Sequence, residues 1–160
     1  MIHRRYLRGG EKGGAGVGKT KRGKGSKIMA VANSAGLPIA ISVGSASPHE
    51  VTLAEPVLEA SFVEERPERL IGDKAYDSDP LRKRLKALKI DLIVPHRNNR
   101  KKPKLQDGRK LRRYRRRWEI ESTFSCLSNF RRLVVRYERH IKMYRAFFHL
   151  ACLMIVLNRF

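Results

Sequence analysis

The chain has 160 residues, 41% of them hydrophobic, which is enough for one folded domain with a buried core. Its 36 Lys and Arg against 15 Asp and Glu give a net charge of +21, which favours nucleic acid as a partner over an anionic membrane surface. The N-terminus lacks an apolar signal core, the apolar run 146–157 is too short to span a bilayer, and two isolated cysteines form no disulfide framework. These features argue against secretion and a membrane partner, and we expect a cytoplasmic protein.

The first part of the chain differs in composition from the rest. Residues 1–27 hold eight glycines, nine Lys or Arg and one acid, which predicts a flexible basic arm, and residues 28–160 are expected to form the folded domain. The runs KIMAVAN and LPIAISV, separated by the turn residues SAG, predict a β-hairpin. A helix should begin near Thr52, with Pro56 close to its start.

The second half alternates strands and helices. RLIGD (69–73) and IDLIVP (90–95) predict two short buried strands. Between them, 77–89 predicts an amphipathic helix with Asp and Ser caps and leucines on one face. The block 96–117 carries twelve Lys or Arg and should pass from loop into a helix that ends near residue 130, followed by a buried helix at about 140–158. This order predicts a mixed α/β sheet flanked by helices.

Two acids are candidates for chemistry. Asp73 ends a predicted buried strand, which is a usual place for a metal-binding or substrate-binding carboxylate in an α/β sheet, although a structural turn role is equally compatible. Glu121 shares a predicted helix face with Tyr114 and Arg117. A carboxylate in so basic a surface is commonly a salt-bridge partner, but it would also suit Mg²⁺ bound together with phosphate oxygens. Glu119 should point to a different face.

The segment GGAGVGKT (13–20) fits the phosphate-binding P-loop pattern, with Gly13, Lys19 and Thr20 at its fixed positions. A working P-loop needs a buried strand before the glycines and a helix that starts at Lys-Thr. The flanking sequences MIHRRYLRGGEK and KRGKGSK predict neither, so we interpret the match as accidental and expect no nucleotide cofactor.

Several motifs together resemble the DDE transposases of bacterial insertion sequences. Tyr114, Arg117 and Glu121 match the first three positions of that family's pattern Y-x2-R-x3-E-x6-K. GDKAYDSDPLR resembles the segment around its second catalytic Asp, which is Asp73 here. The stretch KGSKIMAVANSAGLPIAISVGSASPHEVT and the C-terminal run from FRRLVV onward also resemble the family in order and spacing.

The resemblance implies an RNase H-like fold and a DNA transposase that cuts and joins double-stranded DNA at transposon ends and target. Asp73 and Glu121 would be catalytic residues that bind Mg²⁺ (or Mn²⁺) in a two-metal site. Tyr114 and Arg117, with Arg113 and Arg116 beside them, would contact DNA. A cytoplasmic, nucleoid-associated protein is then expected, with a homodimer among the partner expectations.

The sequence departs from the family pattern at two points. The final Lys of the pattern is Ser128 here. The first catalytic Asp has no counterpart, because Glu11 is the only acid in the predicted arm. If the alignment is right, that Asp belongs just upstream of Met1 and the first strand is largely missing. The chain would then be a truncated or split copy, inactive alone unless an upstream frame product supplies the Asp.

The alternative is a small basic nucleic-acid-binding protein without catalysis. It explains the charge and the size equally well, but it gives no reason for Asp73 and Glu121 to occur in a family-like order. Loss of divalent-metal binding on Asp73→Asn substitution would distinguish the two.

Overall fold

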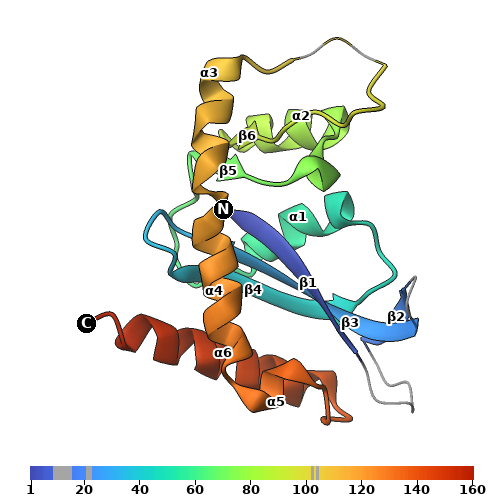
Figure 1. Cartoon of the computed structure of the whole chain (residues 1–160), viewed down its shortest axis with the longest axis vertical. Coiled ribbons are helices and arrows are strands. Elements are labelled where there is room, and N and C mark those ends of the chain that lie inside the picture. Colours follow the sequence, from blue (N-terminus) through green and yellow to red (C-terminus); the bar gives the residue numbers. More distant parts are fainter. Residues whose placement is uncertain (9–15, 21–22, 102, 104) are drawn as a thin grey trace.

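We describe a computed structural model of the chain, which covers residues 1–8, 16–20, 23–101, 103 and 105–160 (Figure 1). The strands are β1 (Ile2–Arg8), β2 (Gly18–Thr20), β3 (Gly23–Ala32), β4 (Pro38–Ser45), β5 (Arg69–Ile71) and β6 (Asp91–Ile93). The α-helices are α1 (Glu50–Glu59), α2 (Asp79–Ala87), α3 (Gly108–Leu111), α4 (Trp118–Ser128), α5 (Arg131–Val134) and α6 (Ile141–Leu157). Two 3-10 segments are η1 (Lys74–Tyr76) and η2 (Arg112–Arg117). The mixed α/β class predicted from the sequence is confirmed.

The predicted hairpin is formed by β3 and β4, which pair antiparallel. Its turn is held by Asn33, whose side-chain Oδ1 accepts hydrogen bonds from the amides of Ala35 (2.9 Å) and Leu37 (3.0 Å). Gly36 adopts a φ of 74°, a left-handed conformation that glycine reaches without steric cost. The turn residues identified in the sequence therefore fix where the chain reverses.

The predicted basic arm is the main difference between sequence and structure. Residues 2–8 are strand β1, which pairs antiparallel with β3 from Ile2↔Val31 to Arg8↔Gly25, and β2 pairs with the beginning of β3. An arm over 1–27 is therefore wrong for these strands, while residues 9–15 and 21–22 lie outside the described residues. The sheet has a strand ahead of the hairpin, so a largely missing first strand is not confirmed.

Strand β3 is buried on both faces because successive side chains of a strand point to opposite sides. Ile28 and Ala30 face a core that includes Phe124 of α4 and Phe148 of α6. Met29 and Val31 face a second core, which includes residues of α1, α2, β5 and β6. The antiparallel sheet thus lies between α4 and α6 on one side and α1 with α2 on the other (Figure 1).

Strands β5 and β6 pair with each other in parallel and lie near the start of β1 (Figure 1). Gly72, directly after β5, packs so closely that a Cβ there would approach Ile2 Cγ2 to 3.1 Å and Tyr76 to 3.0 Å. The absence of a side chain at residue 72 therefore lets the end of β5 meet the beginning of β1. This contact positions Asp73, the next residue.

Several helical predictions need correction. Pro56 lies inside α1 rather than close to its start. Leu88, expected on the buried face of α2, is exposed. Helix α6 was expected to be buried, but it packs only with residues such as Tyr144 and Phe148, because a helix on the surface of one sheet has a single face to bury. In the part of the chain that the structure describes, no helix is long and apolar enough to cross a membrane.

Candidate functional site

Asp73 lies at the end of β5, as the sequence predicted, and begins the 3-10 segment η1. One carboxylate oxygen, Oδ1, accepts a hydrogen bond from the amide of Ala75 at 2.8 Å. This contact fixes the orientation of the carboxylate at the edge where β5 meets β1. No hydrogen bond to Oδ2 is present among the described residues, so this oxygen remains available.

Glu121 projects from α4 and is half exposed, with a side-chain exposure of 50%. Arg117, one turn earlier, donates to Glu121 Oε1 from Nε (3.0 Å) and from a terminal nitrogen (2.6 Å). The other terminal nitrogen of Arg117 donates to the hydroxyl of Tyr114 at 2.7 Å. The three residues that share a predicted helix face thus contact one another. Burial lowers the pKa of Arg117, but the hydrogen bonds to Tyr114 and Glu121 outweigh it and the net shift is upward.

The pKa of His3, on β1, responds to both candidate acids. Burial lowers the pKa of His3, while the carboxylates of Asp73 and Glu121 both act to raise it and Arg117 acts to lower it. The imidazole also makes an edge-on contact with the ring of Phe124, with 5.5 Å between centroids. Its Nδ1 atom is buried and has no hydrogen-bond partner among the described residues. His3 is therefore a neutral, partly buried imidazole in the field of both acids.

Sequence reasoning did not identify His3, because it belongs to the segment interpreted as an arm. The alternation of Ile2, which is buried, with polar neighbours was the only local indication of a strand. Pairing with β3 is what brings the imidazole to Asp73 and Glu121.

The other predicted DNA-contacting residues lie on a separate surface. Arg116 donates to Glu119 Oε1 at 2.7 Å and to the carbonyl of Ser34 at 3.1 Å. With Arg113, Arg66 and others, Arg116 lines an open groove of about 820 Å³ beside β5 and η2. The structure therefore separates Arg113 and Arg116 from the Tyr114–Arg117–Glu121 cluster. As predicted, Glu119 points away from Glu121; it is buried and paired with Arg116.

A preformed metal centre is not present in the described part of the chain, where no three His, Cys, Asp or Glu side chains gather closely enough to bind an ion. Asp73 and Glu121 are thus two acids of a site that other ligands would have to complete.

The P-loop-like segment does not have the structure of a phosphate-binding P-loop. Lys19 and Thr20 lie in β2, which pairs with β3, and no helix begins there. Gly13 lies outside the described residues.

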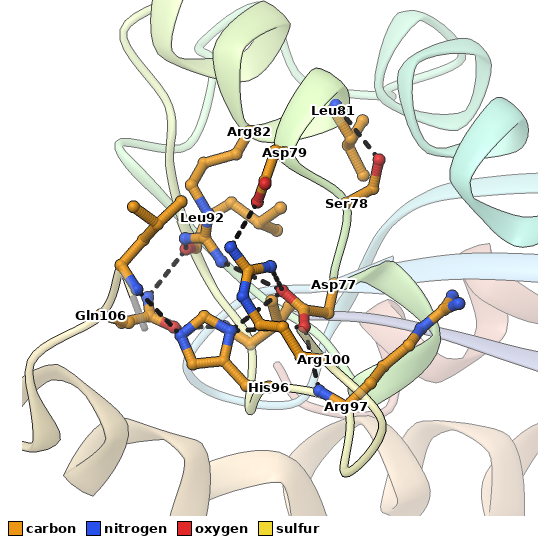
Figure 2. A network of polar contacts seen from close by, with 12 residues as sticks. Asp77, Ser78, Asp79, Leu81, Arg82, Leu92, His96, Arg97, Arg100 and Gln106 are labelled. Atoms are coloured by element: carbon orange, nitrogen blue, oxygen red, sulfur yellow. Dashed lines mark hydrogen bonds and ion pairs between the residues drawn. The ribbon is translucent and has the colours of Figure 1, made fainter. Parts of the chain in front are cut away.

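A third acid, Asp77, holds the start of the basic loop that follows β6 (Figure 2). Its side chain is 1% exposed and accepts from His96 Nδ1 (3.1 Å), the Arg97 amide (2.9 Å) and Arg100 (3.3 Å). His96 Nε2 accepts from the amide of Leu105 at 3.2 Å, so the imidazole proton is on Nδ1 and is donated to Asp77. Asp77 therefore anchors residues 96–100 against α2.

Of the Asp and Ser caps predicted at the start of α2, the structure confirms Ser78 and corrects the assignment of Asp77 and Asp79. Ser78 caps α2 by accepting from the amide of Leu81, and Asp79 forms an ion pair with Arg100 at 2.9 Å. Arg100 forms ion pairs with both carboxylates, and Arg82 lies 3.8 Å from Asp77, so these acids hold the basic loop.

Comparison with known proteins identifies the family of the chain. The model of the family described as "Transposase DDE domain" matches residues 4–157, and the chain belongs to this family. A protein of Burkholderia cepacia assigned as the transposase of insertion sequence element IS402 is 30% identical over 142 residues, covering 84% of this chain and 64% of the relative. A protein of Brucella ovis assigned as the transposase of IS6501 is 31% identical over 137 residues, covering 83% of this chain and 98% of the relative. No solved structure matches.

The chain thus spans about two thirds of the length of the IS402 relative. Both relatives are assigned to insertion sequences, which identifies the group of transposases that this chain resembles. The resemblance inferred from the motifs is confirmed at the level of the family.

Proposed function

We propose that the chain is the catalytic domain of an insertion-sequence transposase, with an RNase H-like arrangement of its sheet and helices. It binds double-stranded DNA, and its reaction is metal-dependent cleavage and joining of DNA strands at transposon ends and target. The observation that carries the proposal is that Asp73 and Glu121, which come from separate elements, both lie beside the start of β1. Gly72, next to Asp73, packs against Ile2, and Glu121 lines one groove with His3.

The residues fit a divalent cation that is completed by substrate. Mg²⁺ is commonly held by one or two carboxylates together with phosphate oxygens, and Asp73 and Glu121 offer such carboxylates. Burial lowers the pKa of His3, so its imidazole is uncharged at neutral pH and does not repel a nearby cation. A bound Mg²⁺ or Mn²⁺ supplies the charge that activates an attacking oxygen and stabilises the leaving oxygen.

Neighbouring residues hold the two carboxylates in place and offer hydrogen-bond donors to DNA. The Ala75 amide holds the carboxylate of Asp73 toward the edge of β5. Arg117 holds Glu121 in place in the free protein, and its guanidinium and the Tyr114 hydroxyl are suited to donate hydrogen bonds to a backbone phosphate of bound DNA. Arg113 and Arg116 lie on the neighbouring groove, where they would contact DNA farther from the reacting phosphate.

A two-metal site requires a third carboxylate, and none joins Asp73 and Glu121 among the described residues. We therefore propose that these residues do not cleave DNA unaided and that a further acid, on a partner or an upstream frame product, completes the site. A homodimer and association with the nucleoid belong to the same proposal. Cleavage of transposon-end DNA by the purified chain with Mg²⁺, abolished by Glu121→Ala, would overturn it.

The alternative, a non-catalytic basic nucleic-acid-binding protein, is favoured by one observation. Glu121 is neutralised by Arg117, as in an ordinary ion pair between residues one helical turn apart. On that view the carboxylate has a structural role only. The two functions differ in whether Asp73 and Glu121 bind a cation.

Binding of Mn²⁺ to the complex of the protein with duplex DNA, followed by electron paramagnetic resonance, tests the proposal. Asp73→Asn removes the charge but keeps a side-chain oxygen that can accept from the Ala75 amide, so the fold is preserved. We expect Mn²⁺ affinity to fall by about tenfold or more, since a charged ligand contributes more than 1.4 kcal/mol. Asp91→Asn, which removes another partly buried acid, on β6, is the control and should bind as the parent does. Equal Mn²⁺ affinity in the two variants would favour the alternative function.

A further inference from the structure

A second feature beside Glu121 has no role in the function proposed so far. An open groove of about 460 Å³ runs between β1 and α4. It is lined by His3, Arg4, Arg5, Glu121, Phe124, Ser125 and Ser128. Guanidinium and hydroxyl groups are the side chains that commonly bind phosphate oxygens in proteins that contact nucleic acid.

Arg5 is the cation of this groove that lies nearest the end of α4. It is two residues from His3 on β1 and therefore points to the same side of the sheet. One terminal nitrogen donates to the carbonyl of Phe124 at 3.3 Å and also to the hydroxyl of Ser128. The Ser128 hydroxyl in turn donates to the same Phe124 carbonyl at 2.7 Å. The guanidinium is thus held in place by neutral groups.

Other cations near the groove already have anionic partners. Arg4 points to the opposite side of β1 and pairs with Glu50 at 3.1 Å. Arg117 pairs with Glu121. Within the described residues, Arg5 has no carboxylate at ion-pair distance, and its remaining N–H donors have no acceptor. It is therefore an oriented but unneutralised cation, which is the state that favours binding of an external anion.

The residue type at position 128 explains why the position of Arg5 is relevant to DNA binding. The Tyr114–Arg117–Glu121 pattern continues in the family with a Lys seven residues after the Glu, and this chain has Ser128 instead. The structure brings the guanidinium of Arg5 to the Ser128 side chain from a different element. A positive charge is therefore present beside the end of α4, but it belongs to Arg5 of β1 and not to residue 128 of the helix.

We propose that Arg5, with the hydroxyl of Ser125 lining the same groove, binds a backbone phosphate of DNA next to Glu121. The planar guanidinium can donate two parallel hydrogen bonds to one phosphate while its third nitrogen stays on Phe124 and Ser128. The proposal rests on the proposed function, because it assumes that DNA lies along this face. It adds a phosphate contact on a strand that the family pattern does not include.

Arg5→Gln tests the proposal with little disturbance of the fold, because an amide can still donate to Phe124 and Ser128. Affinity for a fluorescein-labelled DNA duplex of arbitrary sequence is measured by anisotropy over a range of salt concentrations. Loss of one charge-assisted contact should weaken binding about tenfold at low salt. The slope of log affinity against log salt should become shallower by about 0.9, the value for one phosphate on duplex DNA.

The double variant Arg5→Gln/Ser128→Lys separates a phosphate contact from a structural role. It returns the charge to the same place from α4, so affinity and salt slope should recover most of what Arg5→Gln loses. Arg159→Gln, which removes an equal charge near the C-terminus, is the matched control and should change affinity less than about twofold, as expected for distant surface charge.

The possible results distinguish a failure of the proposed role of Arg5 from a failure of the proposed function on which it rests. Arg5→Gln binding as tightly as Arg159→Gln, or a double variant that does not recover, overturns the role of Arg5 while DNA binding by the parent stands. A parent chain without measurable DNA affinity overturns both. A circular dichroism spectrum and unfolding midpoint equal to those of the parent exclude misfolding as the cause of any loss.

Discussion

Replacing Glu50 with Gln should destabilise the fold strongly, because Glu50 is the anion of a buried cluster that joins three elements. Its carboxylate Oε1 accepts from the Tyr6 hydroxyl of β1 at 2.7 Å and pairs with Lys27 of β3 at 3.2 Å and Arg4 of β1 at 3.1 Å. The side chain of Lys27 is only 1% exposed and also donates to the carbonyl of Pro48. Without Glu50 this ammonium is a buried charge without an anion.

The size of the effect follows from the pKa of Glu50. Burial alone raises that pKa, but the Tyr6 hydroxyl, a backbone amide, Arg4 and Lys27 outweigh burial and lower it from 4.5 to about 2. A shift of this size corresponds to about 3 kcal/mol of stability at neutral pH before screening by water is considered. Because Arg4 is partly exposed and screened by water, we expect about 2 kcal/mol for Glu50→Gln.

The same shift sets a pH dependence. The pKa is lower in the folded state, so the contribution of Glu50 is fully present above the unfolded value near 4.5 and is lost as the pH falls toward about 2. Urea unfolding followed by circular dichroism at neutral pH and at acidic pH measures both quantities. The difference between parent and Glu50→Gln should shrink as the pH falls through this window.

A residue on the same helix provides the control. Glu55 of α1 pairs with Arg84 at 2.7 Å in a more exposed position, so Glu55→Gln should cost less than about 1 kcal/mol. Adding Lys27→Met to Glu50→Gln removes the uncompensated charge and should recover part of the loss. Equal unfolding free energies for Glu50→Gln and Glu55→Gln, or no recovery in the double variant, would refute the reasoning.

Two further predictions concern other buried groups. Asp77→Asn leaves the His96 and Arg100 donors with too few acceptors and should cost about 1–3 kcal/mol, with faster hydrogen exchange at the Arg97 amide measured by mass spectrometry; unchanged exchange would contradict the anchoring role. Burial raises the pKa of the Cys152 thiol to about 12, so a thiol reagent at mildly alkaline pH should modify the half-buried Cys126 of the folded protein first. Equal modification rates for the two cysteines would indicate that α6 opens readily.

The sequence determined the parts of this protein that depend on local rules. The short apolar runs KIMAVAN and LPIAISV fixed β3 and β4, and the turn residues between them fixed the hairpin. Ser78 followed by Pro80 fixed the start of α2. The spacing of Tyr114, Arg117 and Glu121 fixed their common helix face, because side chains three and four residues apart on a helix are neighbours.

Only the tertiary structure decided what β1 contributes. A segment with the composition of residues 1–8 has little apolar surface, so nothing local favours a strand over an arm. Its strand forms because β3 offers unpaired backbone groups along one edge, and because Ile2 is buried against the end of β5. The same pairing exposes the imidazole of His3 to the charges of Asp73 and Glu121. It also lets Arg5 donate a hydrogen bond to Ser128. Contacts between strands and helices so distant in sequence follow from strand pairing, which no local pattern specifies.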